Sequence, residues 1–368
     1  MKFLQHKKIL LISPEAWGKS KVSKHHYAII AGKFGNKVWF LQPSNAFNSI
    51  AEPIPQHITL VEDRYRFRGL RRLPTLLRKL IFKRLIKKME SDLQTQFDVV
   101  WNFDNSRFYD LDCFDAELTI HHCMDYHYHF QFERASRSAD ICFGVTDGIV
   151  ENLKKFNPNS FFIHHGYQEV IGSTYSLMPS TQKLRAVFVG NFMRKDIAWN
   201  WLHQVTTQFD NIHFYFIGNC GLSNLSQTID PDITKQIEEI SQHPNVTFMG
   251  ELNESDSWSA MCQSDILFAA FRADRYPEIF ANLHKIMTYL ATGKPIVINR
   301  IMQFESTPNL LLMAYSEDEF IAHFKLLSTK PETQFGEFAR KNRIEFAYNN
   351  TYEKQFARID QLISTKYT

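Results

Sequence analysis

The segment between residues 283 and 299 constrains the fold of this chain most strongly. Apolar residues recur in its first part at the spacing of one helix face: Leu283, Ile286, Met287 and Leu290. Gly293 and Pro295 follow, where a left-handed cap and a helix stop are expected. Residues 296–298 form a short β-branched run, which is typical of a strand buried in a parallel sheet. This order of helix, tight turn and buried strand predicts an α/β fold.

The same alternation of apolar runs and helical patterns occurs in two separate series. The first predicts strands at residues 8–13, 37–41, 97–103, 117–122 and 161–166, a strand with a helix cap within 138–147, and a helix at 23–33. The second predicts strands at residues 184–190, 212–218, 245–250 and 264–269. A chain of 368 residues is long enough for two domains. We therefore expect one domain over residues 1–170 and another over 184–340, joined by a polar linker.

Cysteine usage and hydropathy bound the cellular setting. The five cysteines are scattered and form no C-x-x-C pair, which favours a reducing compartment over a disulfide framework. No segment approaches the run of ~20 apolar residues that crosses a bilayer, and no signal peptide is recognisable. We therefore expect a cytoplasmic protein.

Residues 64–88 carry eleven lysines or arginines and no acidic residue. Six apolar residues are expected on one side of a helix over about 70–90: Leu73, Leu76, Leu77, Leu80, Ile81 and Leu85. An ordinary surface helix explains this pattern, as does a helix that lies on an anionic membrane. Nucleic acid is not expected, because no recognised nucleic-acid module surrounds the segment. The residues predicted to contact lipid are Arg71, Arg72, Arg78, Lys79, Lys83 and Arg84.

A polar cluster follows the strand expected at residues 117–122. Four histidines, one cysteine and one aspartate lie within residues 121–129. No second cluster with ligand spacing accompanies them, so we predict no metal site. Asp125 or His122 as a general base at a strand end is favoured. Polar residues packed between aromatic rings are the structural alternative.

Residues 285–297 resemble the C-terminal signature of GT-B glycosyltransferases, the family 4 and related sugar transferases. The matching positions are Tyr289, Leu290, Ala291, Gly293, Lys294 and Pro295. Many members carry two glutamates eight residues apart, whereas this chain has Phe280 and Thr288 there; Glu278 lies close enough to replace the first. The resemblance implies a GT-B fold, with two Rossmann-like, doubly wound domains facing each other across a cleft. It also implies that residues 341–368 form a helix that crosses back to the first domain.

The resemblance implies a nucleotide-sugar site in the second domain. Asn282, which we expect at the start of the signature helix with Ala281, would hold the donor diphosphate together with Lys285 and Arg194 or Lys195. The other expected donor-binding residues are Gly190, Gly218, Gly250 and Glu278. No cofactor and no metal enter this scheme, because cationic side chains and the helix dipole would neutralise the leaving diphosphate. The first domain would hold the acceptor.

The expected function is a metal-independent glycosyltransferase of hexosyltransferase type. Its acceptor would be a glycan, lipid-linked if the basic helix meets a membrane, in the assembly of cell-surface polysaccharide or lipopolysaccharide. The protein would then be peripheral on the inner face of the cell membrane. Two alternatives stay open: a non-catalytic partner or scaffold of a glycan-assembly complex, and another GT-B enzyme such as a nucleotide-sugar epimerase.

Overall fold

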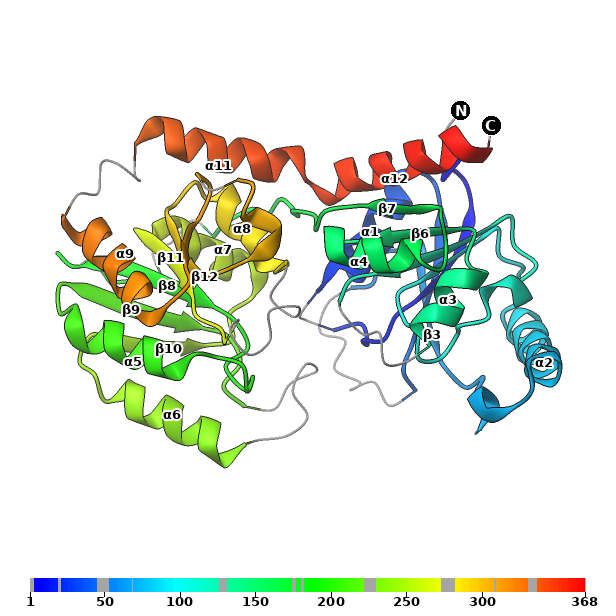
Figure 1. Cartoon of the computed structure of the whole chain (residues 1–368), viewed down its shortest axis with the longest axis horizontal. Helices are drawn as coiled ribbons and strands as arrows, with labels where there is room; N and C mark the ends of the chain where they lie inside the picture. Colours follow the sequence, from blue (N-terminus) through cyan, green and yellow to red (C-terminus); the bar gives the residue numbers. More distant parts are fainter. Residues whose placement is uncertain are drawn as a thin grey trace. The chain divides into compact units, whose positions relative to one another are not determined.

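A computed structural model describes most of the chain (Figure 1). The described residues are 3–18, 21–44, 53–67, 69–125, 131–173, 177–179, 182–221, 230–272, 282–307, 309–329 and 336–367. The chain divides into two compact units. Unit 1 comprises Met1–His165 with Tyr352–Thr368, and unit 2 comprises Gly166–Thr351. The chain thus returns to unit 1 at Tyr352, eleven residues later than the boundary expected at 341.

Unit 1 is built on a seven-stranded parallel sheet with the order β3-β2-β1-β4-β5-β6-β7. Its strands are β1 (Lys8–Ile12), β2 (Lys37–Gln42), β3 (Ile58–Glu62), β4 (Val99–Asn102), β5 (Leu118–Cys123), β6 (Ile141–Gly144) and β7 (Ser160–Phe162). Every residue of β4, β5 and β6 is buried. Such continuous burial is expected where helices cover both faces of a parallel sheet. The strand order reverses between β1 and β4, which makes the sheet doubly wound.

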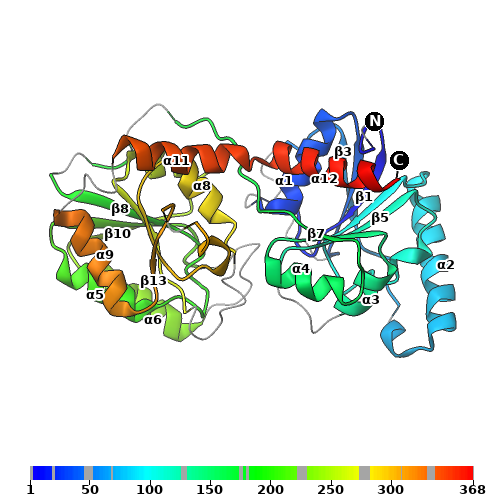
Figure 2. The same ribbon diagram turned by 45° about the horizontal axis from the view of Figure 1, so that its top comes forward.

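The helices of unit 1 include the last helix of the chain. They are α1 (Ser23–Lys33), η1 (Leu70–Arg72), α2 (Thr75–Leu93), η2 (Leu111–Cys113), α3 (Phe132–Ser138), α4 (Asp147–Lys154) and α12 (Tyr352–Tyr367). Helix α12 packs beside α1 in both views (Figures 1 and 2). The Tyr352 hydroxyl donates to Ser23 Oγ at 2.9 Å, and the Phe34 and Phe356 rings stack at 4.7 Å. These contacts attach the end of the chain to its beginning.

Unit 2 is built on a six-stranded parallel sheet with the order β10-β9-β8-β11-β12-β13. Its strands are β8 (Leu184–Val189), β9 (Ile212–Ile217), β10 (Val246–Gly250), β11 (Ile266–Ala269), β12 (Ile296–Asn299) and β13 (Leu312–Ala314). The order reverses between β8 and β11, so this sheet is doubly wound as well. The predicted α/β class is confirmed in both units.

The helices of unit 2 connect these strands and fix the signature segment. They are α5 (Trp199–Gln208), α6 (Pro231–Ser241), α7 (Glu254–Gln263), α8 (Lys285–Ala291), η3 (Met302–Phe304), α9 (Glu317–Thr329) and α11 (Glu337–Asn349). Helix α8 ends just before Gly293, whose φ of 73° is the left-handed conformation predicted there. The buried Arg343 of α11 donates through Nε to the Gly293 carbonyl at 3.0 Å. A cation therefore satisfies the carbonyl end of α8.

The two units have separate hydrophobic cores, and both are rich in aromatic residues. In unit 2, Phe188 contacts Phe192, Phe268 and Phe271 at ring distances of 5.1, 5.5 and 5.8 Å. The edge-to-face and tilted geometries are those that aromatic pairs favour.

Across the part of the chain that the structure describes, every helix is too short or too polar to span a bilayer.

Candidate functional site

Three neighbouring strands of unit 2 end on glycines at one edge of the sheet. Gly190 follows β8, Gly218 follows β9, and Gly250 is the last residue of β10. The Gly190 N–H donates to the Ile217 carbonyl and the Gly218 N–H to the Gly250 carbonyl, each at 2.8 Å. Because the strands are parallel, the structure brings these three predicted residues together at the carboxyl edge. This is the edge where doubly wound sheets bind ligands.

Steric contacts explain why side chains are excluded from this edge. Gly218 has a φ of 138°, and a Cβ added there would lie 1.8 Å from the Gly190 carbonyl oxygen. Gly250 has a φ of 70°, and a Cβ added there would meet no described atom within 4 Å. The first position requires glycine for close backbone packing, whereas at the second no atom of the described residues would contact a Cβ. The edge therefore presents backbone.

Two cationic side chains follow β8 in the loop that leaves this edge. Arg194 forms a bidentate pair with Asp196, at 2.8 Å from Nε and 2.5 Å from one terminal nitrogen. Lys195 is 82% exposed along its side chain and lies 3.0 Å from Asp230. This ion pair is the main reason that the Asp230 pKa is lowered. An anionic ligand at this loop would therefore exchange places with carboxylates that already hold the two cations.

Lys285 of α8 contacts the last residue of β8, Val189. Its Nζ donates to the Val189 carbonyl at 2.7 Å and lies 2.9 Å from where a Cβ on Gly190 would be. The ammonium also lies 5.2 Å from the centre of the Phe188 ring. Desolvation, followed by repulsion from Arg194, lowers the Lys285 pKa to about 7. Lys285, which is predicted to bind the donor diphosphate, thus lies beside Gly190 and is only partly charged near neutral pH.

Tyr289 completes the support from the same face of α8. Its hydroxyl accepts from the Val189 N–H at 2.8 Å, and Lys285 stands one helical turn earlier. Both polar groups of the Val189 backbone are therefore satisfied by α8 side chains. The signature helix fixes the position at which β8 ends and the cationic loop begins.

The predicted start of the signature helix is wrong. Helix α8 begins at Lys285, whereas Asn282 lies buried in a bend before it. Asparagine favours such turns because its side chain competes for backbone hydrogen bonds. Thr288 lies on α8, where the related signature carries a glutamate. Ala281, Glu278 and Phe280 lie outside the described residues.

In unit 1 the two predicted bases occupy different environments. His122, on β5, is fully buried against the rings of Tyr27, Trp101 and Phe103. Burial lowers its pKa well below the usual value, and a hydroxyl of an external acceptor cannot reach its ring. Asp125 lies two residues past β5 and is exposed. Of the two predicted bases, Asp125 is therefore the one that solvent reaches.

Sequence reasoning missed an ionic cluster at the carboxyl edge of the unit 1 sheet. Arg107 pairs with Asp104, lies 3.3 Å from Asp63, and donates to the Ser13 carbonyl. Asp63 follows β3, Ser13 follows β1, and Asp104 lies just beyond β4. In the sequence, the signal for this cluster was that Ser13, Asp63 and Asp104 each follow an apolar run. Their pairing was not visible, because Asp63 and Arg107 are 44 residues apart.

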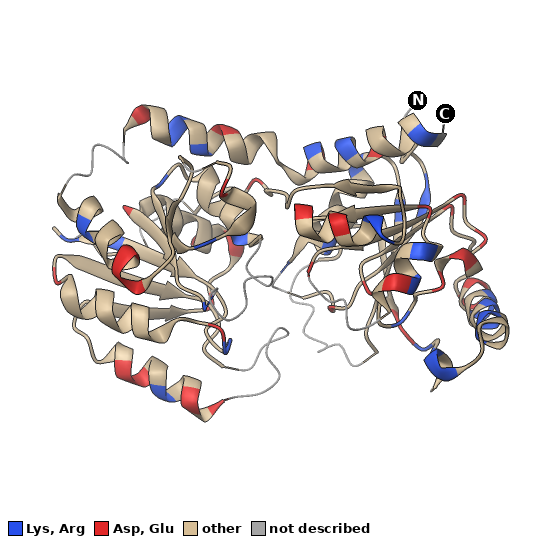
Figure 3. Cartoon of the chain, in the orientation of Figure 1, with Lys and Arg blue, Asp and Glu red and all other residues tan. Residues whose placement is uncertain are grey.

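The basic segment is partly used inside unit 1. Arg78 is buried and donates to Asp110 at 2.6 and 3.2 Å, so its predicted contact with lipid is wrong. Lys79 forms an ion pair with Asp112. The remaining predicted residues are exposed: Arg71, Arg72, Lys83 and Arg84. Figure 3 shows that Lys and Arg predominate along α2.

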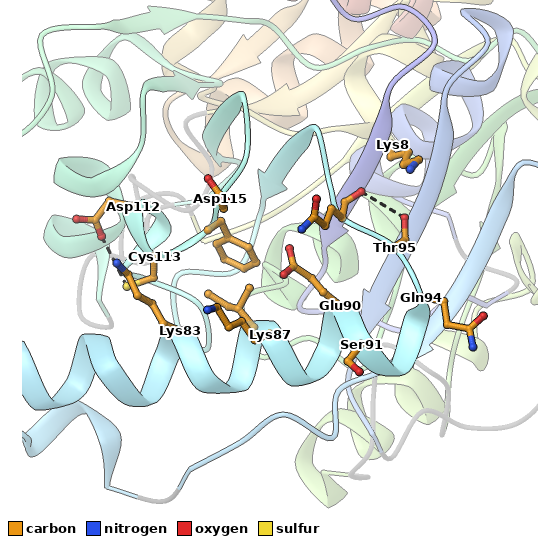
Figure 4. Close-up of a pocket in the computed structure, with 13 residues that line it drawn as sticks. Lys8, Lys83, Lys87, Glu90, Ser91, Gln94, Thr95, Asp112, Cys113 and Asp115 are labelled. Carbon is orange, nitrogen blue, oxygen red and sulfur yellow. Dashed lines mark hydrogen bonds between the residues drawn. The ribbon is translucent and has the colours of Figure 1, made fainter.

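A cavity of about 900 Å³ lies beside the second half of α2 (Figure 4). Lys83, Lys87 and Glu90 of α2 line it, with Asp112 and Asp115 opposite. Lys8, at the amino end of β1, also lines it, so the cavity lies at the edge opposite to strand carboxyl ends. Its mixed charges select no single ligand chemistry.

Within the described ranges, no group of His, Cys, Asp and Glu side chains has the arrangement of a metal site. His127 and His129 lie outside those ranges.

Comparisons with known proteins identify the fold. No protein-family model matches the chain. No curated protein matches it either. Solved structures match over nearly the whole chain. A sucrose-phosphate synthase from Thermosynechococcus elongatus is 14% identical, with 98% of this chain and 99% of that chain covered and a TM-score of 0.70.

Two further structures give the same result. A glycosyltransferase from Rickettsia africae is 12% identical, with 98% of each chain covered and a TM-score of 0.70. Anabaena Alr3699/HepE, in complex with UDP and glucose, is 14% identical, with 98% of this chain and 99% of that chain covered and a TM-score of 0.68. Together with the two doubly wound units, these similarities show that the chain has the GT-B fold.

Proposed function

We propose that this protein is a glycosyltransferase that takes a sugar from a nucleotide-sugar donor bound at the glycine edge of unit 2. The observation that carries the proposal is the bare backbone edge of Gly190, Gly218 and Gly250 beside three cations. A ribose and base need close approach to backbone, whereas a diphosphate needs positive charge. The edge offers both within one unit.

Arg194, Lys195 and Lys285 would serve the leaving diphosphate. Each cation is held near the end of β8 by a carboxylate or a carbonyl. Positive charge beside the leaving diphosphate stabilises the anion that develops during the reaction, and the diphosphate would replace Asp196 and Asp230 as the partner of Arg194 and Lys195. In this proposal the transfer is metal-independent and of hexosyltransferase type, and no cofactor takes part.

Similar structures support the choice of donor. HepE is described in complex with UDP-glucose, and WaaB is described as a lipopolysaccharide outer core galactosyltransferase. We propose a lipid-linked glycan acceptor, with Asp125 as the base that removes its proton. The protein would act in cell-surface polysaccharide or lipopolysaccharide assembly, in the cytoplasm, peripherally on the inner face of the membrane.

A thermal-shift screen against nucleoside diphosphates and nucleotide-sugars, without metal, tests the proposal. A ligand at about 100-fold excess over its Kd adds about 2.7 kcal/mol to the stability of the folded state. For a unit of this size we expect a rise in Tm of about 5–10 °C with one nucleotide series. Arg194→Ala should reduce the shift, whereas Arg185→Ala, a cation on β8 itself, should leave it unchanged.

A non-catalytic role is the second candidate, and Thr288 favours it. This residue stands on α8 where the related signature carries a glutamate. A non-catalytic partner would release no sugar from any nucleotide-sugar, with or without a glycan acceptor. A binding shift without turnover would support this role, whereas sugar transfer would exclude it.

A further inference from the structure

Helix α2 has two apolar faces, and only one of them packs against the core. Phe82, Ile86 and Met89 are buried, together with Arg78. Leu76, Leu77 and Leu80 are 82%, 48% and 60% exposed. At 100° per residue these leucines lie on the opposite side of the helix from Phe82 and Met89. We call Leu76, Leu77 and Leu80 the leucine patch.

The basic residues continue the same exposed face. Lys83 and Arg84 lie one turn beyond Leu80, and Arg71 and Arg72 of η1 precede the helix. None of these four side chains, which we call the basic flank, forms an ion pair with the residues that the structure describes. Residues 64–88 contain no acidic residue that could neutralise them. Arg71, Arg72 and Arg84 are therefore available to an external anionic surface, and Lys83 is exposed at the rim of the cavity that it lines.

Contacts of α2 with the rest of unit 1 fix the orientation of the leucine patch and leave its side chains exposed. Arg78 pairs with the buried Asp110, and Lys79 pairs with Asp112, both on the η2 side of the helix. These contacts fix the rotation of α2, so that the leucines point away from the unit 1 core. Side chains with such high exposure are unusual when several share one helix face.

We propose that the leucine patch of α2 inserts into an anionic lipid bilayer while the basic flank contacts lipid phosphates. This inference rests on the peripheral location proposed above but not on the transferase activity. Interfacial helices bury an apolar face at the boundary between headgroups and acyl chains, with lysine and arginine beside it. Attachment is thus part hydrophobic, not electrostatic alone.

Charge complementarity favours lipid over a second copy of the chain. A two-fold contact through the leucine patch would place one basic flank against the other. Like charges brought together without counter-charges weaken such a contact. An anionic bilayer neutralises the flank instead and accepts the leucines at the same depth.

Flotation of the full-length protein with vesicles tests the proposal. The vesicles are phosphatidylcholine alone, or with roughly one third phosphatidylglycerol. The leucine variant is Leu76→Ser with Leu77→Ser and Leu80→Ser, and the basic variant is Arg71→Gln with Arg72→Gln, Lys83→Gln and Arg84→Gln. Ile171→Ser is the matched control, because Ile171 is 89% exposed but lies in unit 2.

Wild type and Ile171→Ser should float with the anionic vesicles, and the leucine variant should bind roughly tenfold more weakly or worse. Salt at about 0.5 M shortens the Debye length to about 4 Å, yet wild type should keep part of its binding. The leucine variant should then keep none, and the basic variant should lose its preference for anionic vesicles.

Three results would overturn the proposal: no flotation of wild type with anionic vesicles, equal flotation of the leucine variant, or a wild-type dimer that the leucine variant converts to monomer. Nucleotide-induced thermal shifts on the same preparations separate the two proposals. Flotation without any nucleotide-induced shift would support membrane binding by the leucine patch and contradict the proposed transferase. A nucleotide-induced shift without flotation would support nucleotide binding and contradict membrane binding by the leucine patch.

Discussion

The two sheets share a doubly wound topology but end differently at their carboxyl edges. In unit 2, strands β8, β9 and β10 end on Gly190, Gly218 and Gly250. In unit 1, strands β1, β3 and β4 are followed by three residues that Arg107 joins. It donates to the Ser13 carbonyl and pairs with the carboxylates of Asp63 and Asp104. One edge presents backbone, whereas the other carries an ion-pair network.

This contrast shows that topology alone does not specify a binding edge. The residues that directly follow each strand decide whether backbone groups or side chains face outward. The donor site proposed for unit 2 depends on the absence of side chains there. Unit 1 instead has ion pairs at its edge, and its buried histidines make the stability of the unit dependent on pH.

Acidification should produce the largest difference between the units. Burial lowers the pKa of His25, His121 and His164 to about 4, all in unit 1. The unfolded chain binds protons below about pH 6.5, whereas these folded groups do not, so stability falls as pH falls from about 6.5 to 4. Each histidine costs about 2 kcal/mol at pH 5. Hydrogen exchange, corrected for its intrinsic pH dependence, should show β5 opening before β9. Earlier opening of β9 would refute this.

Removal of Arg107 should be the next largest effect. Arg107→Ala leaves Asp104, whose side chain is 5% exposed, without its cation, whereas Asp63 keeps its pair with Arg66 at 2.8 Å. Losing one partner of a buried pair costs about 3–5 kcal/mol. Chemical denaturation should show this loss, while the surviving folded protein keeps its nucleotide-induced shift. Arg137→Ala, which breaks an exposed pair with Glu133, is the control. If Arg107→Ala abolished nucleotide binding in folded protein, the two edges would not be independent.

Gly218→Ala should damage the backbone edge of unit 2. The added Cβ would lie 1.8 Å from the Gly190 carbonyl, and the φ of 138° is strained for alanine. A strained backbone of this kind costs about 1–3 kcal/mol. We expect a lower Tm and loss of the nucleotide-induced shift. Gly221→Ala, where an added Cβ meets no described atom within 4 Å, should change neither. Normal nucleotide affinity in Gly218→Ala would separate this edge from binding.

Proton linkage at Lys285 should give the smallest effect. Its pKa is lowered to about 7, and a bound diphosphate would raise that pKa by favouring the charged form. Affinity for a nucleotide-sugar should therefore fall as pH rises above about 7, by at most about tenfold per pH unit. Titration calorimetry from about pH 7 to 9 measures this slope. Lys285→Met should bind more weakly and without the slope. An unchanged slope in that variant would assign the linkage to another group.

Much of the fold was predictable from local patterns. The helix expected at residues 23–33 is α1 (Ser23–Lys33), and the strand expected at 212–218 is β9 (Ile212–Ile217). Strands β3 and β13, at the ends of their sheets, were missed because short edge strands carry a weak periodic signal. The glycines of unit 2 were predictable because each directly follows or closes an apolar run.

Tertiary contacts account for the remaining errors. Helical spacing predicts that Arg78 contacts lipid, but its partner Asp110 lies 32 residues away in sequence. Strand position predicts His122 as a candidate base, but aromatic rings from other strands and from α1 enclose it. Helical spacing and strand position carry no information about such long-range partners. The same holds for the contact of Lys285 with the Val189 carbonyl.

Hydrogen exchange with and without a nucleotide-sugar tests the central claim most directly. The account predicts slower exchange in residues 190–195, 218–220 and 250–252 of unit 2 when the donor is bound. It also predicts unchanged exchange at the carboxyl edge of unit 1, in residues 102–107. Protection confined to unit 1, or no protection at any of these segments with saturating nucleotide-sugar, would contradict the assignment of the glycine edge as the donor site.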